Sequence, residues 1–318
     1  MDRARARLTA LVVGALGVAL LVAAGFFMLA SAAPGRPTLI VREQAWTAPG
    51  ESLARDLTHA PGECLARRSA DVEVGRALFR SPGLLGGPAA RAGLSCQACH
   101  TNGRVNTRFF LAELTDRAGA ADATSEWASK VRGDGVMNPR DIPDLVGAAD
   151  RTAFGQARDP SLEHFVSGVI AEEFQGVTPP SEAFAGLMAY LRALRADACA
   201  AVEIQITLGL YADDVRRTLS AAEAADRGTA HLLLFAAQDG VGRIVERLPR
   251  SQFGSERRRF EALARELGSV RSAGTAPPAL ATVLPGWRAR FDATLARVAR
   301  RESETYFDEA TLSDALVQ

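Results

Sequence analysis

The chain has 318 residues, enough for about two domains of average size. Hydrophobic residues make up 47% of it, so a sizeable core can form and extended disorder is not expected. Lys and Arg number 37 and Asp and Glu also number 37. This zero formal net charge argues against a nucleic-acid partner, which a basic protein would attract.

The first 33 residues differ in composition from the rest of the chain. Three arginines precede an apolar run that carries no charge before Arg36. About 20 apolar residues are enough to cross a membrane, so we predict a transmembrane helix in residues 1–33. The arginines place its N-terminus in the cytoplasm, which anchors the protein in the cell inner membrane with its main body periplasmic or extracytoplasmic. A cleaved signal peptide remains the alternative, because Ala30-Ser31-Ala32 suits a cleavage site.

Three further regions follow along the chain. Residues 34–62 contain proline, glycine and polar residues, which is typical of a tether. Residues 63–200 hold short helical patterns between Gly- and Pro-rich breaks such as "SPGLLGGP" and "VTPPSE". Residues 201–318 repeat apolar residues at spacings of three and four in four or five segments, which predicts a helical bundle. Alternating strand patterns are scarce, so the fold class expected is all-α.

The stretch "GLSCQACHTNGR" holds two of the four cysteines and one of the four histidines. Cys96, Cys99 and His100 form a Cys-x-x-Cys-His motif, which is the attachment signature of c-type haem. Two cysteines at this spacing lie on one side of a helical turn, so both sulfurs can reach one edge of a porphyrin. The next histidine can then ligate the iron. The expected cofactor is one haem c, attached covalently to Cys96 and Cys99, with His100 as an axial iron ligand.

A Cys-x-x-Cys pair has two other uses. A redox dithiol would favour a βαβ context, which the sequence does not indicate. Half a zinc site would need a second close pair, whereas Cys64 and Cys199 lie far apart in the sequence. We therefore predict an N-terminal transmembrane helix, a cytochrome c-like haem domain at 63–200 and a C-terminal helical bundle.

The stretch "EVGRALFRSPGLLGGPAARAGLSCQACH" resembles the sequence that precedes a haem motif in the bacterial di-haem cytochrome c peroxidase family. The match is carried by Gly75, Leu78, Phe79, Pro82, Leu84, Ser95, Cys96, Cys99 and His100. A second stretch, "IPDLVGAADRTAFGQARDPSLEHFV", is similar to the family through Pro143, Leu145, Phe154, Leu162 and Val166. The resemblance covers about residues 72–194 and implies a related helical fold around a haem.

The chain also departs from this family. Members carry two haem motifs, whereas this chain has one, and Gly155-Gln156 stand where relatives have His-Asp-Gly. A two-haem peroxidase needs one haem to receive electrons and another with an open position for peroxide. The resemblance therefore implies a mono-haem cytochrome domain.

A second axial iron ligand would most often be a methionine or a histidine. Met137, in the loop "RGDGVMNPRDIP", is the favoured candidate, whereas Met188 lies in a helical pattern and is expected to be a core residue. His164, His59 and His231 are weaker candidates. A five-coordinate haem stays possible.

Arg91, Arg104 and Arg108 flank the motif. Arginine binds anionic groups such as haem propionates through paired hydrogen bonds, so we predict that Arg104 and Arg108 help to bind the haem. The alternative, solvated arginine in an arginine-rich chain, has equal weight.

Two cysteines remain once Cys96 and Cys99 hold a haem. Cys64 and Cys199 stand just before the first and just after the last helical pattern of the haem segment. Thiols outside the cytoplasm tend to be oxidised, and the ends of one domain often lie close together. We therefore predict a disulfide between Cys64 and Cys199, with two unrelated thiols as the alternative.

The sequence as a whole predicts a membrane-tethered, extracytoplasmic c-type cytochrome that passes single electrons through one haem. Its expected partners are a redox protein and, through the N-terminal helix, the membrane, with no nucleic acid. A haem peroxidase or oxidase-like enzyme is one alternative and a haem-based sensor is another, each with an open distal site. The C-terminal bundle would dock a partner or cover the haem.

Overall fold

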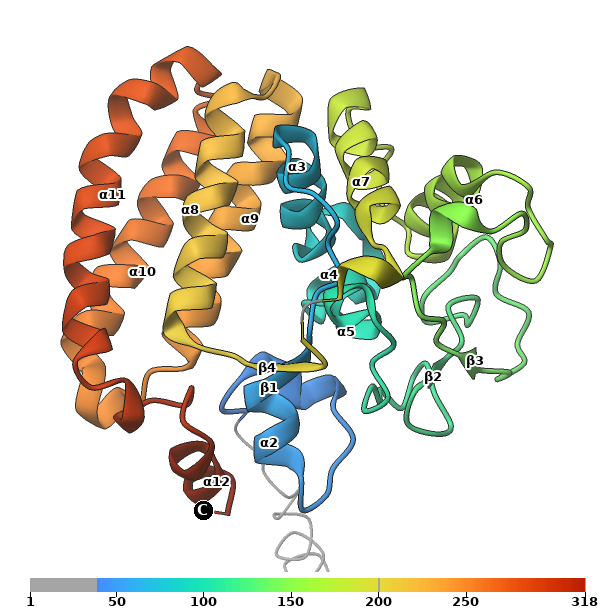
Figure 1. Ribbon diagram of the computed structural model, residues 1–318, viewed down its shortest axis with the longest axis horizontal. Helices are drawn as coiled ribbons and strands as arrows, with labels where there is room; N and C mark the ends of the chain where they lie inside the picture. Colours follow the sequence, from blue (N-terminus) through green and yellow to red (C-terminus); the bar gives the residue numbers. More distant parts are fainter. Residues whose placement is uncertain (1–38, 200, 318) are drawn as a thin grey trace, which may run out of the picture. The chain divides into compact units, whose positions relative to one another are not determined.

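The structure is a computed structural model that describes residues 39–199 and 201–317. This part of the chain is mostly helical, and from Ile40 onward it forms one compact unit (Figure 1). Its helices and strands are, in order, α2 (Leu53–Thr58), β1 (His59–Pro61), α3 (Ala70–Phe79), α4 (Gly87–Arg91), α5 (Cys96–Cys99), β2 (Ala120–Ala121), β3 (Arg140–Asp141), α6 (Leu162–Gly168), α7 (Ser181–Ala193), β4 (Glu203–Gln205), α8 (Leu208–Ala224), α9 (Arg227–Glu246), α10 (Arg250–Ser272), α11 (Pro277–Ala299) and α12 (Glu309–Val317).

The fold class predicted from the sequence needs a correction. Residues 1–33, where we expected a transmembrane helix, lie outside the described residues. Within the described ranges no helix combines the length and the apolar character that a membrane crossing requires. The long helices there carry exposed charged residues, such as Arg216 on α8 and Arg290 on α11. The described fold is therefore mostly helical, with two small antiparallel sheets, β1 with β4 and β2 with β3.

Residues 40–62 were expected to be part of a tether, but the structure folds them against the rest of the unit. Val41, Trp46 and Leu57 are buried. Helix α2 packs on α12 at the other end of the chain, and β1 pairs with β4. The prolines and glycines that suggested a tether instead mark turns between short elements, while the apolar residues among them supply anchors for packing.

Helices α8, α9, α10 and α11 pack side by side as the predicted bundle (Figure 1). Polar residues at their starts cap free backbone N–H groups, as helix N-termini require. Thr207 accepts a hydrogen bond from the Leu210 N–H at 3.2 Å, and Asp226 accepts one from the Thr229 N–H at 2.8 Å. The apolar spacing of three and four residues then directs one face of each helix inward.

Helix α3 joins the motif-bearing segment to this bundle, because it packs on α7, α8 and α9. Its contact with α7 depends on two facing glycines: a Cβ on Gly75 would collide with the carbonyl oxygen of Gly186. One continuous hydrophobic core consequently runs from Phe79 and Tyr190 into Leu219 and Trp287. This core contains residues from both sides of position 200, where the sequence suggested a boundary between two domains.

Candidate haem-binding site

The Cys-x-x-Cys-His motif forms a single helical turn, α5. Ser95 precedes it in an extended conformation, and the His100 N–H donates a hydrogen bond to the Cys96 carbonyl at 2.8 Å. Cys96 and Cys99 are both half-buried and are not bridged to each other. The two thiols and the histidine thus come from adjacent positions of one short, hydrogen-bonded turn.

Both thiols are held in their neutral form. Burial raises the pKa of Cys96 to about 11 and that of Cys99 to about 12, and the neighbouring Cys96 adds to the effect on Cys99. Reactive redox dithiols have the opposite property, because their environment lowers the pKa of the attacking thiol. The pair therefore does not have the electrostatics of a redox dithiol.

The imidazole of His100 is fixed by one hydrogen bond. Its Nδ1 lies 3.0 Å from the carbonyl oxygen of Pro143. A carbonyl oxygen only accepts hydrogen bonds, so Nδ1 carries the proton and Nε2 keeps a free lone pair. Burial lowers the pKa of His100 to about 4, although the bond to Pro143 opposes that change. His100 is therefore neutral near pH 7, as a metal-binding imidazole must be.

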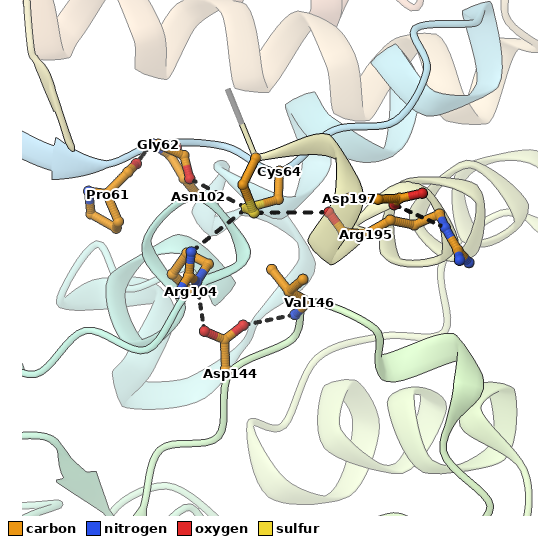
Figure 2. The surroundings of a disulfide bond; sticks show 10 residues. Pro61, Gly62, Cys64, Asn102, Arg104, Asp144, Val146, Arg195 and Asp197 are labelled. Carbon is orange, nitrogen blue, oxygen red and sulfur yellow. Dashed lines mark hydrogen bonds and ion pairs between the residues drawn. A yellow bond between two sulfur atoms is a disulfide. The ribbon is translucent and has the colours of Figure 1, made fainter. Parts of the chain in front are cut away.

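The turn that carries Pro143 is itself held in place. The Arg104 Nε donates a hydrogen bond to Asp144 Oδ2 at 2.6 Å, and Asp144 Oδ1 accepts one from the Val146 N–H at 2.8 Å (Figure 2). The Leu145 N–H donates to the carbonyl of Gly103 at 2.9 Å. These contacts link the residues after His100 to the loop that supplies its acceptor.

Asn102 has a structural role that the sequence analysis did not assign. It is buried, adopts a left-handed backbone with φ of 55°, and accepts an N–H hydrogen bond from Arg80, which directly follows α3. Its side-chain amide donates to the Pro61 carbonyl at 2.7 Å, and its own N–H donates to the Gln97 side chain at 2.9 Å. The Asn-Gly pair at 102–103 was a turn signal that could have indicated it.

Cys64 and Cys199 form a disulfide, with their Cα atoms 4.0 Å apart, and this is the pairing expected from the sequence (Figure 2). Cys64 is fully buried, whereas Cys199 is exposed. The Arg104 Nη1 lies 3.6 Å from Cys64 Sγ, within hydrogen-bonding reach of that sulfur. The pairing of β1 with β4 and a bridge between Leu65 and Leu194 bring the two ends of the segment together.

The two arginines expected to bind the haem have protein partners in the structure. Arg104 pairs with Asp144, as described above. Arg108 pairs with Asp56 at 2.8 Å and donates to the Ala48 carbonyl at 3.1 Å, so it holds the N-terminal segment against the motif. Arg151, which the sequence analysis did not select, donates to the backbone carbonyl of Asp144. Its charge also contributes to lowering the pKa of His100.

The candidates for a second axial ligand lie in different environments. Met137 is 50% exposed in a loop, whereas Met188 is buried in the core beside α3. His164 pairs with Asp159, and His59 contacts Thr58 at 3.1 Å. His231 is exposed near the start of α9. The structure thus brings Cys96, Cys99 and His100 together, and it does not itself select a second ligand among these five side chains.

The apolar surroundings of the motif fit a haem. Helix α6 contains no buried residue, although Leu162, Phe165 and Val166 are apolar. Half-buried apolar side chains pack against the same two cores as the two motif cysteines. At the edge of the larger core, which extends through the whole unit, Cys96 accompanies side chains that include Leu145, Leu162 and Val166. At the edge of the smaller core, Cys99 accompanies Val105, Leu111, Trp127 and Phe174. Such partly covered apolar side chains are what a largely apolar macrocycle would cover.

Two thiols and one neutral imidazole on a single turn are the groups that a c-type haem requires from a protein. Among the described residues, no three His, Cys, Asp or Glu side chains gather closely enough to hold a metal ion. A haem iron needs no such cluster, because the porphyrin supplies four of its ligands and the protein adds only axial ones.

The opposite face of α5 borders a charged cavity of about 410 Å³. Gln97, Ala98 and Thr101 line it from the motif side, and α8 and α9 line it from the bundle side. The arginines Arg42, Arg68, Arg76, Arg80, Arg243 and Arg247 are nearly balanced there by Glu43, Asp56, Glu63, Asp214 and Asp239. The cavity therefore lies between the motif and the bundle. Charges of both signs line it, so it has no strong net charge.

No protein-family model, no curated protein and no solved structure matches this chain. The interpretation of the site consequently depends on the motif and on the geometry around it.

Proposed function

We propose that the protein is a mono-haem c-type cytochrome that transfers single electrons outside the cytoplasm. One observation carries the proposal: His100 directly follows the two thiols, and its Nδ1–H is bound to the Pro143 carbonyl while Nε2 stays free. Histidines that bind metals regularly give their other ring N–H to a carbonyl or carboxylate, which fixes the tautomer and the ring orientation. Such an arrangement suits an axial iron ligand.

Cys96 and Cys99 would attach the cofactor. Each neutral thiol would add across one vinyl C=C, forming a C–S bond while its hydrogen goes to the neighbouring carbon, so the attachment would consume no oxidant. The haem, once bound, supplies an iron that gains or loses one electron. His100 would hold the iron, and the half-buried apolar side chains at the edges of the two cores would exclude water from the cofactor.

An extracytoplasmic location is part of the same proposal. The bridge between Cys64 and Cys199 supports it, because disulfides persist in oxidising compartments and are rare in the cytosol. Covalent attachment also suits a compartment in which a lost cofactor could not readily be replaced. The electron donor and acceptor would be other redox proteins, since a single one-electron centre exchanges one electron at a time.

A peroxidase-like enzyme is the second candidate, and a pair of side chains beside Phe174 favours it. Glu173 ends a π-helix (Val169–Glu173), lies 2.9 Å from Arg132 and is buried. Burial raises the pKa of Glu173, against the opposing charge of Arg132, and buried carboxyl groups with shifted pKa values cluster at functional sites. Peroxide reduction takes two protons and two electrons to give two waters, and a haem with an open distal position would be needed.

The experiment starts from protein matured in a periplasm with a haem-attachment system. We expect the intact mass to exceed the chain by one haem, and the haem to stay with the protein in acid–acetone. The Cys96→Ser, Cys99→Ser variant should have the bare mass. A bare mass for the unaltered protein would refute the haem proposal.

Absorbance spectra then separate the two candidates. A low-spin, six-coordinate reduced spectrum that carbon monoxide does not change supports electron transfer. A high-spin spectrum that changes with carbon monoxide or peroxide supports the enzyme instead, and the Glu173→Gln variant should then lose peroxide turnover while keeping its haem.

A further inference from the structure

The loop that holds the acceptor of His100 is fixed by an ion pair and by backbone contacts. Asp144, next to Pro143, accepts from the Arg104 Nε at 2.6 Å through one carboxylate oxygen. The other oxygen accepts from the Val146 N–H at 2.8 Å, which closes the turn. The backbone carbonyl of Asp144 accepts a further hydrogen bond from Arg151. Both the side chain and the backbone of Asp144 are therefore occupied.

Arg104 is in turn held from its other side. Its Nη1 lies 3.6 Å from the buried Cys64 Sγ of the disulfide, so the guanidinium group bridges the disulfide and the Pro143 turn (Figure 2). The guanidinium is planar and offers Nε and Nη donors at a fixed angle, which a lysine ammonium cannot reproduce. Arg104 also follows His100 closely in the chain, so it ties the motif to its acceptor loop in space.

We propose that Arg104 and Asp144 are positioning residues for His100, which set the reduction potential of the iron by fixing the Pro143 carbonyl. The inference rests on the proposed function, since it needs an iron bound to His100. A strong Nδ1–H bond makes Nε2 a better electron donor and favours the ferric state. Loosening the turn weakens that bond, favours the ferrous state and raises the potential.

Charge alone would act differently from positioning. Loss of the Asp144 carboxylate would raise the potential, because a nearby negative charge stabilises the ferric centre. A charge-keeping change at Arg104 would leave the potential where it was. The Arg104→Lys variant therefore separates the two effects, because it keeps the charge and removes the donor geometry.

The experiment is a redox titration, followed by absorbance, of the haem-loaded full chain and three variants. We expect Arg104→Lys and Asp144→Asn both to raise the ferrous-to-ferric ratio at the wild-type midpoint, by up to about tenfold. A tenfold change corresponds to about 59 mV for a one-electron couple. The matched control is Arg195→Lys, because Arg195 lies near the same disulfide but pairs with Asp150 and Asp197. Its midpoint should not move.

Three outcomes overturn the inference. An unchanged midpoint in Arg104→Lys would leave only a charge effect, and a lowered midpoint would reverse the proposed cause. Loss of haem from both variants but not from the Arg195→Lys control would make the pair a folding element. If the unaltered protein carries no haem, the proposed function fails first, which distinguishes that failure from an unshifted titration.

Discussion

The bundle of α8 to α11 and the motif segment between α4 and α6 are stabilised by different interactions. The bundle buries large side chains such as Phe260, Trp287 and Phe291 along regular helices. The motif segment has few regular elements, and α6 buries no residue at all. It has a smaller buried core that includes Phe109 and Leu114, and hydrogen bonds and ion pairs such as that between Arg104 and Asp144 hold its loops.

This difference has a physical consequence. A bundle with its own apolar core needs nothing further to be stable, because area removed from water is the dominant favourable term in folding. The loop-rich motif segment has a smaller core, with Phe109 and Leu114 fully buried, and its half-buried apolar side chains gain the rest of that term only when something covers them. On our proposal the haem would cover the half-buried apolar side chains of the motif segment and so complete its core.

The largest effect is therefore expected from removal of the haem, and it should be confined to the motif segment. Protein made without haem, as the Cys96→Ser, Cys99→Ser variant, should lose protection from hydrogen exchange at the amides of 103–160, by about 100-fold or more. Amides in α8 to α11 should keep theirs. Hydrogen–deuterium exchange with mass spectrometry measures both in one sample. An equal loss of protection in both regions would mean that the bundle depends on the haem as much as the motif segment does.

The second prediction tests the core of the bundle. Trp287 is 1% exposed, stacks on Phe291 and donates its indole N–H to the Leu263 carbonyl at 3.0 Å. Trp287→Ala should lower the free energy of unfolding by about 3–5 kcal/mol, because it leaves a cavity in the core and removes the indole hydrogen bond. Denaturant unfolding measures the change. Val283→Ala, at an exposed position of the same helix, is the control and should cost much less.

The third prediction concerns the charges where the two regions meet. Glu63 contacts Arg76 at 2.9 Å and Arg80 at 3.1 Å, and Arg76 also pairs with Asp214 of α8. Burial raises the pKa of Glu63, but Arg80 and Arg76 outweigh it and bring the pKa to about 2, below the ordinary 4.5.

A lowered folded pKa stabilises the protein above the unfolded pKa, and this stabilisation is lost as pH falls from about 4.5 towards 2. The shift is worth about 3 kcal/mol. Glu63→Gln should lose a similar amount at pH 7 and should show a flatter dependence on pH over that range. Thermal unfolding at a series of pH values gives both results, and an unchanged slope would exclude Glu63 as the titrating group.

The last prediction concerns the disulfide, whose expected effect is about as large as that of Glu63. Its removal in Cys64→Ala, Cys199→Ala should destabilise the unit by about 2–4 kcal/mol, because the bridge restrains the unfolded chain over a separation of 135 residues. Unfolding with and without a reductant measures the cost in the unaltered protein, and the variant should not respond to the reductant. Two free thiols titrated in the denatured, unreduced protein would mean that the bridge does not form.

Several features of the site could be anticipated because they are local. The spacing of Cys96, Cys99 and His100 already indicated one turn with three convergent groups. Ser161, which directly follows a proline, caps α6 by accepting the His164 N–H at 3.1 Å, a position that suits a helix start. Capping and spacing depend only on neighbours within a few residues, so a sequence pattern can report them.

Other features depended on partners far away in the chain. Pro143 was matched to a family pattern, but its carbonyl as the acceptor for His100 was not anticipated. Arg104 and Arg108 were expected either to bind the haem or to be solvated, and their carboxylate partners, Asp144 and Asp56, were not anticipated. An arginine pattern does not specify which carboxylate comes near, because that depends on how distant segments pack.

The sequence by itself determined the periodic helices of the bundle, the motif turn and the two cysteines left to pair. Each follows from residue type and short-range spacing, which the backbone geometry of a helix translates directly into a face or a turn. Tertiary structure alone decided that residues 40–62 fold, that one core crosses residue 200, and that the Pro143 carbonyl fixes the His100 tautomer. These depend on burial and hydrogen bonding between segments far apart in the chain, where the free energy comes from contacts that no local pattern contains.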